Sequence, residues 1–141
     1  MQRIVKAKII VEGSVESELI VFKHPISLLG EYNPYQGVIY SEGRKIDVKN
    51  KIIFVPMIRG STVGSYVLYA AKENNAAPSG IISPSPDPIL ITGAIISDIP
   101  LYQPLETLDL DEISRYKYAY LDQNTSSIIF SNRNKLKSNN S

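Results

Sequence analysis

Apolar residues recur along the chain in short runs rich in β-branched side chains, a pattern typical of strands. The runs are separated by turn residues such as Glu12-Gly13-Ser14 and Asp122-Gln123-Asn124. One run, residues 51–56, is almost continuously apolar, as expected for a strand buried on both faces. Strands are predicted at residues 3–11, 15–22, 37–40, 46–48, 51–56, 79–83, 116–120 and 127–131.

Two segments have helical rather than strand spacing. Residues 62–74 place apolar side chains near a 3.6-residue period and end at Asn74-Asn75, which favours a helix terminus. Asp87-Pro88 combines a favoured N-cap with a favoured first helical residue and predicts a short helix over residues 89–96. Residues 25–37 and 57–61 are predicted as loops. This order of strands and helices is compatible with an α/β fold.

The length and composition predict one domain without a membrane segment. Residues 1–131 are predicted to form this domain, and residues 132–141 a disordered polar tail. Hydrophobic residues make up 43% of the chain, charged residues 21%, and the net charge is +1, which argues against a nucleic-acid footprint. No apolar run approaches the roughly 18 residues of a membrane span, and the alternating start at residues 1–6 does not resemble a secretory signal. A cytoplasmic protein is expected.

The residue types exclude several chemistries. There is no cysteine, which removes disulfides, thiolate catalysis and thiolate-held metals, including an iron–sulfur cluster carried by this chain. His24 is the one histidine, and its position before Pro25 is typical of a loop residue. No metal site is therefore expected from this chain alone.

The segment Ile58-Arg59-Gly60-Ser61-Thr62-Val63-Gly64-Ser65-Tyr66 is the most informative, because a buried strand precedes it and a helix follows it. A helix N-terminus favours anions, and Arg59 can bind a carboxylate or a phosphate in bidentate fashion. In a dry site, such groups could also stabilise the alkoxide of Ser61 and make it a base. The alternative is structural: Ser61 is only an N-cap, and Gly64 only a helix-packing glycine.

Residues 59–65 resemble the glycine- and serine-rich motif of the aconitase X swivel domain family. The similarity continues through Ala77-Pro78-Ser79-Gly80-Ile81-Ile82 and Asp87-Pro88-Ile89-Leu90-Ile91-Thr92-Gly93-Ala94-Ile95-Ile96. Residues 30–39 resemble the family's glycine-proline-glycine loop, although Glu31-Tyr32-Asn33 replaces the Gly-Val-Asp of many relatives, so a simple turn at Asn33-Pro34 is favoured there. The resemblance covers residues 3–131 and implies a swivelling β/β/α domain.

This resemblance implies the small subunit of a [4Fe-4S]-dependent hydro-lyase that dehydrates (R)-5-phosphomevalonate to trans-anhydromevalonate 5-phosphate in a mevalonate pathway. It implies that Ser61, the first serine after the motif's Arg-Gly, is the proton acceptor, with Thr62 as the alternative position, and that a partner large subunit carries the cluster. Arg59 is expected to hold the substrate. Further substrate-binding residues are expected at Gly60, Thr62, Gly64 and Ser65. The alternatives are a small subunit of a hydroxyproline dehydratase and a non-catalytic module that binds an anion or a partner.

Overall fold

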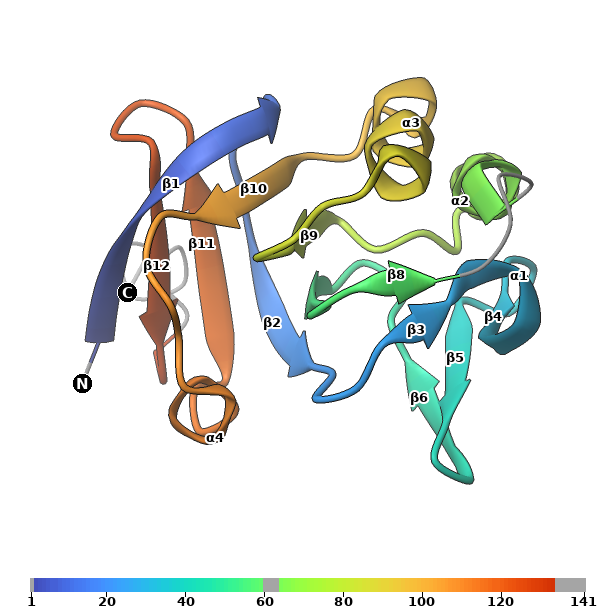
Figure 1. The fold of residues 1–141 in the computed structure, drawn as a ribbon, viewed down its shortest axis with the longest axis horizontal. Helices are drawn as coiled ribbons and strands as arrows, with labels where there is room; N and C mark the ends of the chain where they lie inside the picture. The colour runs from blue at the N-terminus through green and yellow to red at the C-terminus, as the bar shows by residue number, and fades with distance from the viewer. Residues whose placement is uncertain (1, 60–63, 134–141) are drawn as a thin grey trace.

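The protein is described here by a computed structural model that covers residues 2–59 and 64–133. Within these ranges, seven strands close into a barrel, because the first strand along the chain pairs with the last. Figure 1 shows the barrel on one side and the helices α2 and α3 beyond its edge. In barrel order the strands are β1 (Gln2–Val11), β10 (Leu101–Pro104), β9 (Gly80–Ile82), β7 (Ile52–Phe54), β2 (Val15–Val21), β11 (Tyr118–Asp122) and β12 (Ser127–Ser131).

Four neighbouring strands of the barrel, β2, β7, β9 and β10, run parallel to one another. Parallel strands need long crossover connections, and helices provide two of these connections. Helix α2 (Gly64–Glu73) lies between β7 and β9 in the sequence, and helix α3 (Pro88–Ser97) lies between β9 and β10. The carboxyl ends of β7 and β9 therefore lead toward the start of α2 and of α3.

Both predicted helices are confirmed, with local reasons for their ends. The Asp87 carboxylate accepts the N–H of Leu90 at 2.9 Å, and Pro88 is the first helical residue, as the sequence predicts. Asn75 has φ +56°, the left-handed conformation expected where α2 terminates. The predicted start of this helix at Thr62 lies outside the described residues.

The long strands and the closing hairpin are also confirmed, but the predicted loops are wrong in part. Residues 25–37 include β3 (Ile26–Ser27), helix α1 (Leu28–Glu31) and β4 (Tyr32–Asn33), and residues 57–61 include β8 (Ile58–Arg59). Strand β3 pairs in parallel with β8, and β4 forms a small sheet with β5 (Val38–Ser41) and β6 (Arg44–Asp47). Such two-residue strands are too short to show a period, so their pairing comes from the tertiary structure. Strand β10 and helix α4 (Leu110–Ile113) have four residues each and are also too short to show a period, so the sequence does not predict them.

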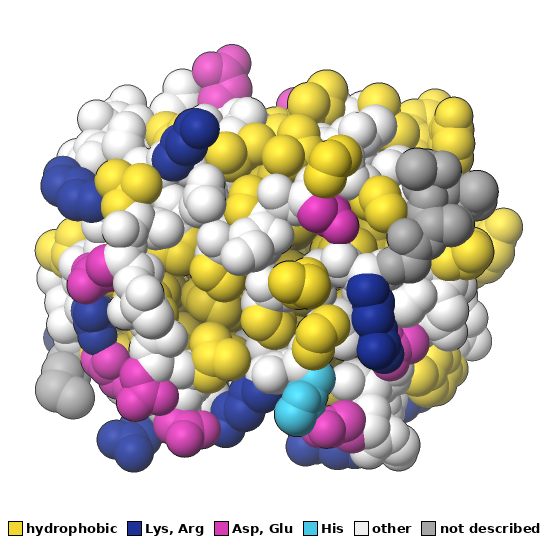
Figure 2. Space-filling model, viewed as in Figure 1, with side chains coloured by type: hydrophobic (Ala, Val, Ile, Leu, Met, Phe, Trp, Pro, Cys, Tyr) yellow, Lys and Arg dark blue, Asp and Glu magenta, His cyan; other side chains and the backbone are white. Residues whose placement is uncertain are grey.

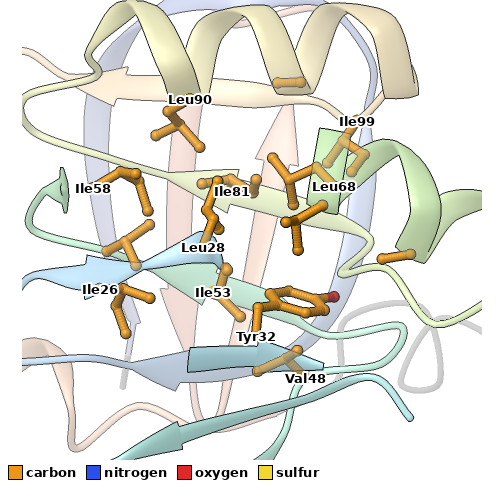
Figure 3. Packing of buried hydrophobic residues seen from close by; sticks show 14 of the residues in the cluster. Ile26, Leu28, Tyr32, Val48, Ile53, Ile58, Leu68, Ile81, Leu90 and Ile99 are labelled. Atoms are coloured by element: carbon orange, nitrogen blue, oxygen red, sulfur yellow. The ribbon is translucent and has the colours of Figure 1, made fainter. Parts of the chain in front are cut away.

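The hydrophobic residues form two cores, one on each face of the parallel strands. Alternate positions of β7 point to opposite sides: Ile52 and Phe54 belong to the cluster inside the barrel, and Ile53 belongs to the cluster under the helices. All three are at most 2% exposed, which confirms the prediction of a strand buried on both faces. Figure 3 shows the second cluster, in which Leu68 and Leu90 from α2 and α3 lie over Ile53 and Ile81 from the sheet.

Two buried tyrosines join distant parts of the chain. The Tyr32 hydroxyl donates to the carbonyl of Ala76 at 2.9 Å and so connects β4 to the end of α2. The Tyr102 hydroxyl donates to the carbonyl of Gly13 at 2.8 Å. Burial raises the pKa of Tyr32, with a further contribution from the Asp47 carboxylate, and burial also raises the pKa of Tyr102 to about 12.

These shifts predict a loss of stability in alkaline solution. A tyrosine in the unfolded chain ionises near pH 10, whereas folding keeps Tyr32 and Tyr102 protonated to higher pH. Their contribution is complete below about pH 10 and is lost as the pH rises through about 12. The unfolding free energy, measured with urea at a series of pH values, should therefore fall above about pH 10. A Tyr32→Phe/Tyr102→Phe double variant should show a shallower fall, and an equal fall in both proteins would contradict this origin.

Over the part of the chain that the structure describes, no helix combines the length and the apolar character needed to cross a membrane.

Candidate functional site

The candidate site lies where β8 ends and α2 begins. Backbone pairing holds β8 in place: Ile58 and Arg59 face Ile26 and Ser27 in register, and the N–H of Ile26 donates to the carbonyl of Met57 at 3.0 Å. Residues 60–63, which include the predicted base Ser61 and the predicted donors Gly60 and Thr62, lie outside the described residues. The two ends of this segment, Arg59 and Gly64, are both placed.

The helices α2 and α3 start side by side at this site. The Ser65 hydroxyl donates to the carbonyl of Ile89 at 2.9 Å near the start of both helices. The Lys72 ammonium approaches the carbonyl of Asp98 at 3.5 Å near the end of both, so the two helices run in the same direction. Their positive N-terminal ends therefore lie next to each other, an arrangement that favours an anion nearby.

Two glycines differ in how tightly they are packed between these helices. A Cβ on Gly64 would meet side-chain atoms of Leu28 and Ile89 at 3.4 Å, which is an ordinary contact distance. A Cβ on Gly93 would lie 2.9 Å from the Leu68 side chain and 3.3 Å from the carbonyl oxygen of Ser65. The close approach of α2 and α3 thus depends on Gly93, which the sequence did not single out for this role.

Arg59 extends from the end of β8 beside a carboxylate of α1. Its Nη2 atom lies 4.0 Å from Oε1 of Glu31, and the Arg59 side chain is 63% exposed. The same Oε1 atom accepts the backbone N–H of Ser27 at 2.7 Å, and the Ser27 hydroxyl accepts the N–H of Gly30 at 3.1 Å. This arrangement is similar to a capping box, in which a residue at the helix start and an acidic residue one turn later satisfy backbone donors. Glu31 therefore joins α1 to the candidate site.

The predicted site residues divide into two groups. Arg59 is exposed at the edge of the site, whereas Gly64 and Ser65 are buried at the contact between α2 and α3. The Ser65 hydroxyl hydrogen is directed to a carbonyl within the protein, so it has a structural role there. The expectation that Ser65 and Gly64 also contribute donors to a substrate stays a prediction, as do the roles of Ser61, Gly60 and Thr62.

The loop that follows α1 is a turn, as expected. The Asn33 side-chain oxygen accepts the N–H groups of Tyr35 and Gln36 at 2.9 and 3.1 Å. A shallow pocket opens over this turn and borders Glu31. Its walls are formed by α1, β4, the turn and one tyrosine of β5: Gly30, Glu31, Tyr32, Asn33, Pro34, Tyr35 and Tyr40. No pattern in the sequence predicts this pocket, because its walls meet only through the pairing of β4 with β5.

The donors for a metal cluster do not come together in this chain. The sequence contains no cysteine, and across residues 2–59 and 64–133 no three His, Asp or Glu side chains are grouped as metal ligands. His24 follows β2 in a loop, where its Nε2 atom lies 2.9 Å from Oε1 of Glu42. The residues of this chain therefore do not fit an iron–sulfur cluster.

Figure 2 shows acidic and basic side chains interspersed on one face of the molecule, between broad hydrophobic areas.

Comparisons with known proteins show the family to which the chain is related. The Aconitase X swivel domain family matches residues 4–130. The phosphomevalonate dehydratase small subunit of Methanosarcina mazei is 42% identical over 104 residues, which cover 72% of each chain. The protein of the same name from Thermococcus kodakarensis is 46% identical over 99 residues, which cover 68% of this chain and 74% of that one.

Solved structures show the same fold. The crystal structure of Thermococcus kodakaraensis aconitase X in its holo-form matches with a TM-score of 0.79 and 36% identity, over 91% of this chain and 98% of that chain. The solution NMR structure of a UPF0107 protein matches with a TM-score of 0.72 and 28% identity, over 91% and 97% of the two chains. These matches confirm the α/β swivel fold that the sequence predicts. The chain belongs to the aconitase X swivel domain family.

Proposed function

We propose that this chain is the small subunit of a phosphomevalonate dehydratase, a hydro-lyase that acts in the cytoplasm and is active only with a large subunit. The observation that carries the proposal is the match to relatives of that name over 68–72% of this chain, at 42–46% identity. The substrate, (R)-5-phosphomevalonate, carries a carboxylate and a phosphate. An anionic substrate suits a site bordered by Arg59 and by the starts of α2 and α3.

Dehydration of a β-hydroxy acid removes a proton from the α-carbon and a hydroxide from the β-carbon. This chain supplies the first half: Ser61 accepts the α-proton as a general base. The guanidinium of Arg59 holds the substrate carboxylate or an adjacent anion, and the N–H groups of residues 60–65 complete the pocket together with the Thr62 hydroxyl. The loss of hydroxide is assigned to groups outside this chain.

The [4Fe-4S] cluster is placed on the partner, because such clusters are held by cysteine thiolates and this chain has none. Exposed apolar side chains near the site support a partner. Leu29 on α1 is 56% exposed, and Tyr66 and Tyr69 on α2 are 67% and 44% exposed. A substrate pocket enclosed by both chains would cover these side chains and exclude water from the base.

Activity measurements on the isolated chain and on the complex test this proposal. The small subunit purified alone should contain no iron and show no dehydratase activity, whereas co-expression with its large subunit should give a complex that dehydrates (R)-5-phosphomevalonate. Turnover by the isolated, metal-free chain would contradict the division of roles.

The substrate is tested on the same complex. Turnover of hydroxyproline but not of phosphomevalonate would favour the alternative dehydratase. A stable complex that is inactive with both substrates would favour a non-catalytic binding module.

A further inference from the structure

Glu31 is fixed before any substrate arrives. Its Oε1 atom accepts the backbone N–H of Ser27 at 2.7 Å, and its side chain is 26% exposed. Ser27 itself is held by the pairing of β3 with β8, in register with Arg59. The carboxylate therefore has a defined position relative to the end of β8.

Arg59 is less restrained. Its side chain is 63% exposed, and within the described residues its one ion pair is the contact of Nη2 with Oε1 of Glu31 at 4.0 Å. A free arginine side chain samples many rotamers, and ordering it on a ligand has an entropic cost. An anchored carboxylate at one edge of the guanidinium reduces this cost and leaves the other donors of the planar group available.

We propose that Glu31 is a positioning residue for the reaction, which restrains the Arg59 guanidinium so that it receives the substrate anion in a fixed orientation. This inference rests on the proposed function for its catalytic consequence. The sequence points to no such role, because residues 31–33 are where the chain departs from many relatives. The contact joins positions 28 residues apart on α1 and β8.

The charge of Glu31 has two opposite effects on substrate binding. It orders Arg59, which lowers the KM, and it repels the anionic substrate, which raises the KM. The geometry favours ordering, because among the described residues Arg59 is the one cation paired with the Glu31 carboxylate. The carboxylate is also partly exposed, so salt weakens its repulsion of a more distant anion. The sign of the change in KM therefore distinguishes the two effects.

The first test observes Arg59 directly in the full small subunit, without any need for activity. In a ¹⁵N-labelled sample, the heteronuclear NOE of the Arg59 Nε–H group should indicate an ordered side chain. Glu31→Gln keeps an acceptor for the Ser27 N–H but removes the charge, so this NOE should fall to that of a freely mobile arginine. The matched control is Ser27→Ala, which removes the hydroxyl cap of α1 and leaves the ion pair intact. The proposal would be overturned if the Arg59 NOE were equally high, or equally low, in all three proteins.

The second test uses the assembled enzyme. Glu31→Gln should raise the KM by about 2- to 5-fold, as expected for the loss of an exposed ion pair, and should change kcat less. In an Arg59→Gln background the same change should have no further effect, because the two residues act as a pair. A lower KM in Glu31→Gln would show that repulsion dominates and would overturn the positioning role. An inactive wild-type complex would instead contradict the proposed function, and the NMR result would still decide whether Glu31 orders Arg59.

Discussion

Replacing Ser61 by alanine should abolish turnover in the assembled complex while leaving the fold and the complex intact. The change removes one oxygen atom, so little packing is lost. If Ser61 is the base, the rate should fall by roughly 100-fold or more, with little change in substrate affinity. The measurement is kcat and KM of the purified complex, together with the melting temperature of the small subunit.

Thr62→Ala is the matched control for Ser61→Ala, since the neighbouring residue also carries a hydroxyl in the same segment. It should retain most of kcat, whereas the loss of a pocket hydroxyl should raise KM. A nearly active Ser61→Ala enzyme beside an inactive Thr62→Ala enzyme would move the base by one residue. Two active variants would leave the segment with a structural role only, in which an N-cap serine contributes about 0.5–2 kcal/mol to stability.

Gly37→Ala should be among the most destabilising single changes in the chain, with an expected loss of about 2–4 kcal/mol in the unfolding free energy. Gly37 has φ +70°, which disfavours any residue with a side chain. The added Cβ would also lie 2.9 Å from the carbonyl oxygen of Ala76 and 3.0 Å from the Cβ of Lys49. Urea unfolding of the variant and of the wild-type chain gives the difference.

Gly43→Ala separates the two causes. Gly43 has φ +74° in the turn between β5 and β6, but apart from its two chain neighbours no residue has an atom within 4 Å of where its Cβ would be. This variant should therefore show only the conformational cost, about 1–2 kcal/mol. Equal losses at both positions would mean that the contact of Gly37 with the end of α2 contributes nothing.

Features with a local physical cause could be predicted from the sequence. The cap of α3 follows from Asp87-Pro88, because both residues act on the adjacent helical turn. The doubly buried strand β7 follows from its uninterrupted apolar run, and the turn after α1 follows from the side chain of Asn33. In each case the information lies within a few residues of the element that it determines.

Features that depend on distant residues could not be predicted from local patterns. Strands β3 and β8 contain two residues each, and they exist because each satisfies the backbone of the other. The closure of the barrel joins residues more than a hundred positions apart, such as Gln2 and Ser131. The contact of Glu31 with Arg59 arises from the same pairing, so the candidate site could be located from its motif but its neighbours could not.

The closure of the barrel by β1 and β12 also makes this domain suitable for rearrangement by protein engineering. Gln2 faces Ser131 directly in the β1–β12 ladder, so a short linker could join the two strands without disturbing the barrel. New ends could then be opened at the exposed turn between β5 and β6, where Gly43 has no close neighbours. A circular permutant of this kind would carry its new ends at the tip of this hairpin, where Glu42 lies beside His24, and they could serve as a point for a genetic tether to another polypeptide.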